Sequence, residues 1–593
     1  MNNVWTDALS VLTGEWQLVA VILVFVFFGQ SLIHLCLKGI FENRLTPAEY
    51  LSLGLAGWLL PALLISLLWY LTRLNVIIWI LLAALILYFL IRLPLRGLRK
   101  LDYRSASVSR VLFIILTVFL FVLLRLVYVS NALFPLYFDS AQHYSVIKNI
   151  VQQGAVWVFN WLNIVYYHLG FHFLTAFFAS VLNMEITRSM LVLGQVILAL
   201  IPFSVFFPVR HATKSNAAGW FAVLLSAFGW YMPAHAIDWG KYPALMSLGM
   251  IPFTLNLIYL LKSQNPDSIN LPVKIRWVLY GFIGLSALLT VFTHSRSLIV
   301  LGIVCLAWIL SVWWQKLPKR QVVFLVIVII TLLEAIFILK QSVLVLLFDP
   351  YLYKGILITG LILFLSIFAW TGYPRLTFII VLTTTLLLAS LFIQVTILPG
   401  YRDLTLLDRP FVEMILFMPL SMLGGLGLSG LEKKLQGRFV WSRYVGLLAL
   451  GIVIVNAYFT YDLYPSDCCV IVGNDDVVAM DWLANELPID ARIGISSTQL
   501  RVLTLEASEG DVGADAGIWI TPLTGRVTVS LPYNTDFNDS VTWKTICEEQ
   551  VDYLFVGEVG YPFDGGKIDA HPEWYRPLLS MPKTRVYEVI GCN

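Results

Sequence analysis

Long apolar runs alternate with short polar segments along most of this chain of 593 residues. Each run covers about 16 to 23 residues, which lets a helix cross a hydrocarbon layer about 30 Å thick. The pattern therefore predicts a polytopic α-helical membrane protein with about fourteen transmembrane helices. We expect these spans at residues 16–36, 48–70, 74–93, 111–130, 189–209, 217–234, 243–261, 277–293, 297–314, 321–339, 355–370, 376–397, 411–431 and 444–462.

Two segments depart from this pattern. Residues 172–182 are apolar but short, so we expect a membrane-surface helix within one long outer segment, 131–188. Residues 463–593 carry charged and turn residues, short β-rich runs such as 491–496, and apolar residues at helical spacing in 476–487. This last part of the chain predicts a small α/β domain.

Basic residues concentrate in alternate loops between the predicted spans, as in 92–110 and 315–320. Cytoplasmic loops of membrane proteins are rich in Lys and Arg. We therefore expect an integral plasma-membrane protein with its N-terminus and its C-terminal domain on the extracytoplasmic side. The net charge of +3 indicates no nucleic-acid partner.

The predicted spans divide the chain into three parts. The basic loop 92–110 separates the first three spans from the rest, so residues 1–110 are expected to form an accessory unit. Residues 111–462 form the predicted core, and 463–593 the outer domain. The first apolar run is span-length and follows no basic segment, so we expect a retained helix rather than a cleaved signal.

Four of the six cysteines lie in the predicted outer domain: Cys468, Cys469, Cys547 and Cys592. Such clustering suits an oxidising compartment. Three pairings are open, and we expect a disulfide that joins the start of the domain to Cys547 or Cys592. Free buried thiols are the alternative.

Polar residues gather in the predicted outer loops, at one depth of the membrane. Asp139 and His143 stand four residues apart and would share one helix face. Ionisable groups near a bilayer are costly, and they are usually functional or paired. The other candidates are His235, Asp238, Lys241, Tyr242, His294, Arg296, Arg402 and Arg409.

Each candidate also has a purely structural explanation. Asp139 would cap the helix that follows it, and Asp238 with Lys241 would form a surface ion pair of little energy. The histidines would donate structural hydrogen bonds, and Arg402 and Arg409 would be solvated loop charges. Three further ionisable residues, inside or at the edge of spans, are expected to pair within the bundle: Arg125, Glu334 and Glu413.

Residues 111–462 resemble the GT-C superfamily of membrane glycosyltransferases, which includes the oligosaccharyltransferase catalytic subunit and the protein O-mannosyltransferases. In that family a span precedes a long outer loop with an essential acid near its start, as in FDSAQHY here. Two spans joined by a basic turn follow, as in VRHATKSNAAG, and then an outer loop with a second acid, as in HAIDWGKYP. A later segment pairs an arginine with Pro and small residues, as in LDRPFVEMILFMPLSMLGG.

The chain also departs from that family. It has no WWDYG-like motif, which the oligosaccharyltransferases use to hold their acceptor peptide, so peptide N-glycosylation is not expected. The nearest tryptophan motif is GIWITPLTGR, which contains Trp519 and Arg526. Asp238 stands alone rather than in a paired-acid motif. A divalent metal, Mg or Mn held by Asp139 and Asp238, is therefore left open.

The resemblance implies an inverting transferase that takes a sugar from a polyprenyl-phosphate carrier. The acceptor would be a glycan, lipid or protein outside the cytoplasm. Asp139 would act as general base or would orient the acceptor, assisted by His143. Arg409 would clamp the departing phosphate. Its expected helpers are Arg402, Arg296 and His294.

The acceptor side of this implied site would be lined by Asp238 and Lys241, with Tyr242 as a further substrate contact. In the outer domain, Trp519 and Tyr533 would stack on sugar rings or would be ordinary core aromatics.

Two other classes of function fit many spans with polar residues. One is a transporter or flippase of lipid-linked saccharides, and the other is a non-catalytic scaffold that anchors the outer domain. Transporters often have repeated halves with broken helices at the midplane. One outward-opening cavity lined by Asp139, Asp238, His294 and Arg409 would favour the transferase. A midplane tunnel would favour transport, and scattered positions of these residues would favour the scaffold.

Overall fold

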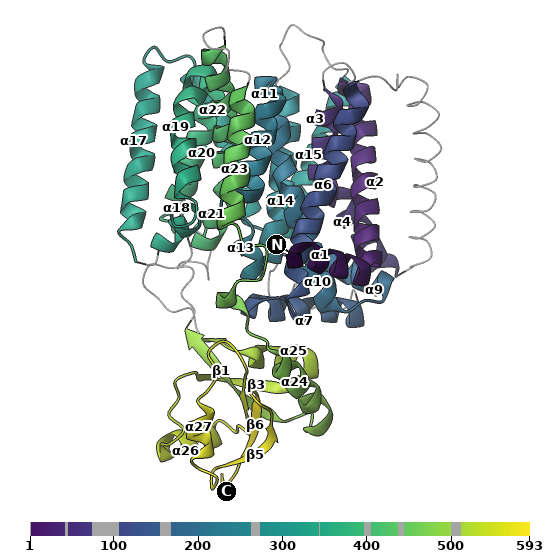
Figure 1. Cartoon of the computed structure of the whole chain (residues 1–593), viewed down its shortest axis with the longest axis vertical. Helices are drawn as coiled ribbons and strands as arrows, with labels where there is room; N and C mark the ends of the chain where they lie inside the picture. Colours follow the sequence, from purple (N-terminus) through teal and green to yellow (C-terminus); the bar gives the residue numbers. More distant parts are fainter. Residues whose placement is uncertain are drawn as a thin grey trace.

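Helices fill most of the chain up to residue 460, and a sheet with short helices fills the remainder. The computed structural model describes residues 2–41, 45–73, 106–154, 168–262, 273–342, 344–395, 405–436, 444–499 and 511–592. The long helices stand side by side in one bundle, and the smaller α/β domain lies against one end of it (Figure 1).

The bundle contains nine described stretches of helix that are long and apolar enough to cross a membrane, or ten if one bent pair is a single span. This arrangement defines a polytopic helical membrane protein. The helices of these stretches are α2 (Trp16–Phe41), α3 (Pro47–Gly57) with α4 (Leu59–Thr72), α6 (Ala106–Ser130), α10 (Ile186–Leu200) with η2 (Ile201–Val205) and α11 (Phe206–Thr213), α14 (Tyr242–Lys262), α15 (Val273–Thr293), α16 (Ser297–Trp314), α17 (Arg320–Leu339), and α21 (Arg409–Ile415) with α22 (Phe417–Leu435).

The remaining predicted spans correspond to shorter or bent helices. α12 (Asn216–Phe228), α20 (Pro374–Ala389) and α23 (Val445–Thr460) are apolar but shorter than a full span. The helices η3 (Val345–Phe348) and α18 (Asp349–Leu352) meet α19 (Ile356–Gly372) at an angle of 90°. The predicted span 74–93 lies outside the described residues. The helical class is therefore confirmed, and the number fourteen stays a prediction.

Local capping interactions fix where several of these helices begin. Thr46 caps α3 through a capping box with Glu49, and Pro47 occupies the first turn. Asp408 caps α21 by accepting a hydrogen bond of 3.0 Å from the Phe411 amide. The start of α21 is thus set by its own sequence, and this start carries Arg409.

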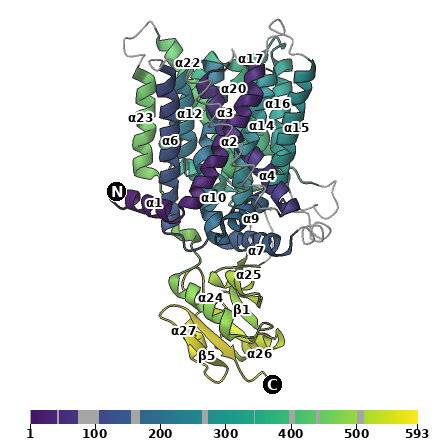
Figure 2. The same ribbon diagram turned by 90° about the vertical axis from the view of Figure 1, so that its right-hand side faces the viewer.

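Three helices lie at the end of the bundle that faces the outer domain. They are α1 (Asn2–Gly14), α7 (Tyr137–Gln153) and α9 (Gly170–Leu182), and α7 lies across this end (Figures 1 and 2). The α9 helix is shorter than a span, as its sequence predicts, and residues 170–179 are buried on all sides. The N-terminal helix and the outer domain therefore share one end of the bundle.

The outer domain is a mixed sheet flanked by short helices. Its strands are β1 (Arg492–Gln499), β2 (Asp511–Gly513), β3 (Val527–Pro532), β4 (Tyr553–Val556), β5 (Tyr575–Ser580) and β6 (Arg585–Val589). The order is β2-β1-β4-β6-β5, and β3 pairs with β1. Strands β3 and β4 both run parallel to β1. The helices are α24 (Asn474–Glu486), α25 (Ile520–Thr524), α26 (Ser540–Glu548) and α27 (Gly565–Asp569). The sheet and the helix α24 lie where the sequence predicts them.

The outer domain docks on α7 through one tryptophan and one lysine. Trp519 is fully buried, and its ring lies 5.0 Å from the Phe134 ring and 5.6 Å from the Tyr144 ring. Lys148 Nζ donates to the carbonyl oxygens of Pro522 (2.7 Å) and Leu523 (3.2 Å). The expectation that Trp519 stacks on a sugar is therefore wrong, because its ring is covered by α7 and the loop before it.

Two disulfides join the four cysteines of the outer domain, in a pairing that differs from the expected one. Cys547 pairs with Cys592, and Cys468 pairs with its neighbour Cys469. The start of the domain, including Cys469, packs into the hydrophobic core of the bundle. Cys547 lies in α26, at the end of the domain away from the bundle (Figure 1). This separation explains why no bond joins the two regions.

The Cys547–Cys592 bond closes a long loop, with a sequence separation of 45 residues. Replacing both cysteines by serine should lower the free energy of unfolding of the outer domain by about 4 kcal/mol, because the unfolded chain regains loop entropy. Pulse proteolysis of the intact protein in urea would measure the change. Cys305→Ala removes a free thiol from α16 and serves as the control. Equal resistance of both variants would contradict the prediction.

Candidate functional site

A cavity of about 300 Å³ lies at the end of the bundle that carries the outer domain. Four separate segments line it: the start of α7, the turn before α14, the η3–α18 segment and the start of α21. The lining residues are Tyr137, Phe138, Tyr231, His235, Trp239, Lys241, Leu346, Asp349, Pro350, Arg409, Pro410 and Glu413. The walls thus combine aromatic rings with both signs of charge, which is typical of a binding site for a polar ligand.

Hydrogen bonds between the walls hold the cavity in shape. The Tyr351 hydroxyl in α18 donates to the Glu413 carbonyl oxygen in α21, at 2.6 Å. Trp230, just before the second wall, donates from Nε1 to Thr359 Oγ1 in α19 at 2.9 Å, and Thr359 Oγ1 donates to the Tyr351 carbonyl oxygen in α18 at 2.7 Å. The bent η3–α18 segment is therefore tied to the two walls that carry the charged groups.

Lys241 and Asp139 form an ion pair at the edge of this cavity, although they are far apart in the sequence. Asp139 stands in the first turn of α7, where the helix dipole favours a negative charge. The side chains of Lys241 and Asp139 are 25% and 17% exposed, so both remain within reach of a ligand. The structure thus brings together the acid of one predicted outer loop and the base of the next.

Gly240 makes this approach possible. Its φ of +65° lies in the left-handed region that favours glycine. A Cβ atom at position 240 would lie 2.5 Å from Ser140 Oγ and 3.1 Å from the Leu136 carbonyl oxygen, both at the start of α7. The turn that carries Lys241 can therefore pack directly on the helix turn that carries Asp139.

Arg409 is the second cation of the cavity. Its Nη1 lies 3.1 Å from Glu413 Oε2, one helical turn away, and its guanidinium lies 5.8 Å from the centre of the Trp239 ring. Arg409 Nε is buried and has no hydrogen-bond partner among the described residues. Within the described chain, Arg409 Nε–H is therefore an enclosed, unpartnered donor beside an aromatic wall.

Tyr137 lines the same cavity as Lys241 and Arg409. It has a φ of +66°, which a non-glycine residue adopts at a cost of about 1–3 kcal/mol and which is most frequent at functional sites. Burial raises the pKa of its phenol. The positive charge of Lys241 partly offsets this rise, and the negative charge of Asp139 adds to it. The phenol is therefore a neutral donor at the cavity wall.

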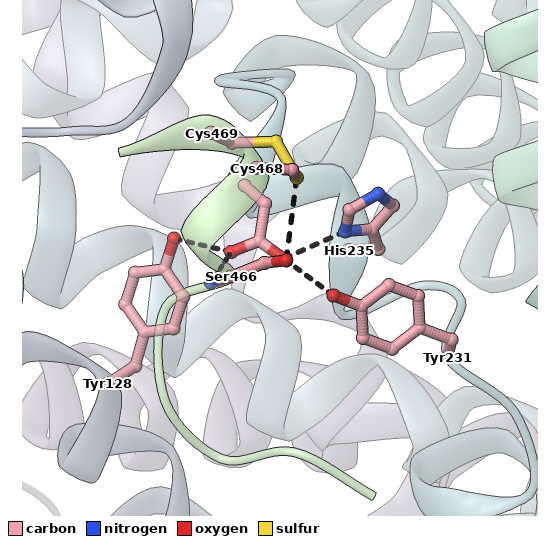
Figure 3. The surroundings of a disulfide bond; sticks show 7 residues. Tyr128, Tyr231, His235, Ser466, Cys468 and Cys469 are labelled. Atoms are coloured by element: carbon pink, nitrogen blue, oxygen red, sulfur yellow. Dashed lines mark hydrogen bonds and ion pairs between the residues drawn. A yellow bond between two sulfur atoms is a disulfide. The ribbon is translucent and has the colours of Figure 1, made fainter. Parts of the chain in front are cut away.

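Asp238 is enclosed by hydrogen-bond donors, of which Figure 3 labels Tyr128, Tyr231, His235 and Ser466. It accepts from the Tyr128 hydroxyl and the Ser466 amide at one oxygen (2.8 and 3.4 Å), and from His235 and Tyr231 at the other (2.8 and 3.4 Å). Burial and this carboxylate raise the pKa of Tyr231 to about 12. Asp238 is 4% exposed, so it positions its neighbours rather than contacting a ligand.

The predicted metal pair, Asp139 and Asp238, is not assembled into a metal-binding cluster. Among the described residues, no group of three or more His, Cys, Asp or Glu side chains is arranged to hold a metal ion. Asp139 is paired with Lys241, and Asp238 is enclosed by its four donors.

Two of the predicted histidines, His143 and His294, lie in a buried group beside the cavity, whereas His235 lines the cavity. His143 Nδ1 lies 3.0 Å from His172 Nε2, and burial lowers the pKa of His143 to about 3. The His294 ring stacks on Phe411 of α21 at 4.7 Å and lies 4.2 Å from the His168 ring. The His143 side chain is 3% exposed and contacts His172 rather than the cavity, and its role beside Asp139 stays a prediction.

Other predicted residues also lie apart from the cavity. Arg296 pairs with Asp408 at 2.7 Å and so supports the start of α21. Tyr242 is fully buried and stacks on Phe171 at 5.2 Å, so it offers no surface to a substrate. Arg402 lies outside the described residues. The structure therefore leaves Lys241 and Arg409 as the predicted cations that line the cavity.

Sequence reasoning missed Asp349 and Trp239. Asp349 lines the cavity, is exposed, and its carboxylate has no hydrogen bond or ion pair within the described chain. The signal for it was the short polar break FDPYLYKG between two predicted spans. Trp239 stands next to Asp238 in the motif HAIDWGKYP, where only the charged residues were considered.

Fold and cavity together define a polytopic helical membrane protein with a charged, aromatic-walled site beside an outer domain. The chain belongs to a family of unknown function (DUF6541), whose model matches residues 47–395. This match includes three walls of the cavity and ends before Arg409. No curated protein matches the sequence.

The close packing at Gly240 gives a direct test of how the cavity is assembled. Gly240→Ala should destabilise the protein by more than about 1 kcal/mol, because alanine adopts a positive φ poorly and its Cβ meets Ser140. Thermal unfolding of the purified protein measures this change. Gly281→Ala is the matched control, because a Cβ there meets open space on α15. If the two variants unfold at the same temperature, the proposed packing is wrong.

Proposed function

We propose that this protein is a membrane glycosyltransferase that moves a sugar from a polyprenyl-phosphate donor to an extracytoplasmic acceptor. The observation that carries the proposal is the cavity in which Lys241 and Arg409 stand beside the rings of Trp239 and Tyr137. The cavity lies at the end of the bundle, next to the outer domain. A lipid carrier would keep its chain in the membrane while its head group enters this site.

The donor phosphate would bind between the two cations. Arginine binds phosphate oxygens in a bidentate manner, and lysine contributes a compact point charge. At rest each cation has one carboxylate partner, Glu413 for Arg409 and Asp139 for Lys241. A phosphate would draw both cations towards itself, and this releases the carboxylate of Asp139.

The released Asp139 would then act on the acceptor. The acceptor oxygen attacks the anomeric carbon, and its proton passes to the Asp139 carboxylate. The bond between the anomeric carbon and the phosphate oxygen breaks, and its electron pair stays on the phosphate, where Arg409 and Lys241 stabilise the charge. Direct displacement of this kind inverts the anomeric centre. Asp349 is a second carboxylate of the same cavity and would face the acceptor side.

Asp139→Asn should lower the rate of transfer by about 10²–10⁴-fold, because the acceptor loses its general base. Release of polyprenyl phosphate from a panel of radiolabelled polyprenyl-phosphate sugars, in proteoliposomes, measures turnover. Asp536→Asn is the control, because it neutralises an exposed aspartate of the outer domain. Asp349→Asn removes the same charge from the η3–α18 wall of the cavity.

Full turnover by Asp139→Asn with loss of turnover in Asp349→Asn would assign the base to Asp349 instead. Intact sugar lipid moved across the bilayer, without release of polyprenyl phosphate, would indicate the flippase alternative.

Arg409→Gln should lower kcat/KM for the donor by about 10²–10³-fold, because the departing phosphate loses its main partner. Arg409→Lys should reduce kcat/KM by a smaller factor, because lysine keeps the positive charge but lacks the planar guanidinium that binds two phosphate oxygens. The same proteoliposome assay measures both. The double variant Arg409→Gln/Glu413→Gln removes the carboxylate that Arg409 neutralises. If this double variant regains wild-type turnover, Arg409 serves only to balance Glu413.

A further inference from the structure

The carboxyl ends of three parallel strands in the outer domain meet at one edge of its sheet. β1 ends at Gln499, β3 at Pro532 and β4 at Val556, and β1 lies between the other two. In open α/β sheets, ligands bind outside the carboxyl ends of the parallel strands. This edge is therefore the first place to look for a ligand site in the outer domain.

Two tyrosines stand at this edge with their rings exposed. Tyr533 follows β3 and is 43% exposed, and Tyr561 follows β4 and is 62% exposed. Their ring centres lie 5.5 Å apart, with the ring planes inclined by 52°. The two rings thus form an open aromatic corner rather than part of the hydrophobic core.

The backbone holds both tyrosines in place. The Tyr533 amide donates to the Ser497 carbonyl oxygen at 2.9 Å, and the Tyr561 amide donates to the Ala514 carbonyl oxygen at 3.0 Å. Gly560, with φ of +88°, packs so closely on Ala514 that a Cβ would lie within 2.3 Å of its carbonyl oxygen. An aromatic pair held in this way loses little entropy when a ligand binds.

The buried carboxylate of Asp515 links two loops at the same edge. Asp515 is fully buried and accepts from the Gly517 amide at 2.9 Å and from the Gly557 amide at 3.2 Å. It therefore joins the turn after β2 to the loop 557–561 that presents Tyr561.

This edge faces the bundle. Val559, in the loop after β4, lines a cavity of about 370 Å³ together with residues 130–136, which lead into α7. The loop 557–561 that presents Tyr561 therefore lies beside the segment that runs directly into Tyr137, and Tyr137 lines the charged cavity. The aromatic corner is therefore adjacent to the proposed catalytic site and belongs to a different domain.

We propose that Tyr533 and Tyr561 form a carbohydrate-binding subsite on the outer domain. The ring faces would pack on the apolar C–H patches of a pyranose, and the phenol hydroxyls would bond its hydroxyls. The subsite holds a saccharide chain whose end reaches the charged cavity. Its role as the acceptor site rests on the proposed function, whereas saccharide binding itself does not.

Saturation-transfer NMR on the full-length protein in nanodiscs tests this proposal, with maltohexaose, cellohexaose, mannohexaose and chitohexaose as probes. At least one probe should bind to the wild type. Tyr533→Ala and Tyr561→Ala should each raise the Kd of that probe about three- to tenfold. Tyr561→Phe keeps the ring and should retain binding. Tyr553→Ala is the matched control, because Tyr553 begins β4 at the opposite edge of the sheet.

Binding of none of the four saccharides overturns the proposal, and so does unchanged binding in both alanine variants. Equal weakening by Tyr553→Ala also overturns it, because the effect would then be a general loss of the fold. Measurement in the Asp139→Asn protein separates the two proposals. Retained binding with unaltered transfer in that variant would overturn the assignment of Asp139 and leave the subsite standing.

Discussion

One buried carboxylate holds the functional end of this molecule together. Asp238 accepts hydrogen bonds from Tyr128 in α6, from His235 and Tyr231 in the turn before α14, and from the Ser466 amide in the linker to the outer domain. A buried charge is costly unless it is fully paired, and removing one partner of a buried pair typically costs about 3–5 kcal/mol. The position of Lys241 in the cavity and the position of the outer domain therefore depend on the same residue.

A second contact supports this junction from the membrane side. The Arg125 guanidinium lies 4.8 Å from the centre of the Tyr461 ring. Tyr461 directly follows α23, the last helix of the bundle. Arg125 Nη2 also donates to the Ala227 carbonyl oxygen at 3.4 Å, which holds the guanidinium against α12. The linker is thus held at two successive points, and the docking of Trp519 on α7 adds a third. These contacts explain how a sheet edge of one domain comes to lie beside a cavity of the other.

The structural elements that depend on the local pattern of apolar and polar residues could be predicted from the sequence. The apolar runs predict the bundle helices, and the short run 172–182 predicts the short helix α9. The β-rich runs and the helical spacing in 476–487 predict the sheet domain with α24. Asp139 and Lys241 form the ion pair that two neighbouring outer loops allow. Of the four residues expected to line one cavity, Asp139, Asp238, His294 and Arg409, only Arg409 is among the lining residues. Which side of the membrane this end faces stays a prediction.

Burial, disulfide pairing and the full lining of the cavity depend on tertiary packing, so they could not be predicted from one sequence. Asp238 and Tyr242 look like surface groups of an outer loop, and only the packing of α6 and the linker shows that they are enclosed. The disulfide pairing was wrong because the sequence does not show that Cys469 enters the bundle core while Cys547 lies far from it. Asp349 was missed because a short polar break between two apolar runs resembles an ordinary loop.

The central claim is that the cations of the cavity hold the phosphate of a lipid-linked sugar. Cryo-electron microscopy of the protein in nanodiscs loaded with polyprenyl phosphate tests this claim most directly. We expect the phosphate within hydrogen-bond distance of both Arg409 and Lys241, with the lipid chain leaving along the bundle. A phosphate bound at the opposite end of the helices, or a cavity that stays empty at saturating lipid, would contradict the account.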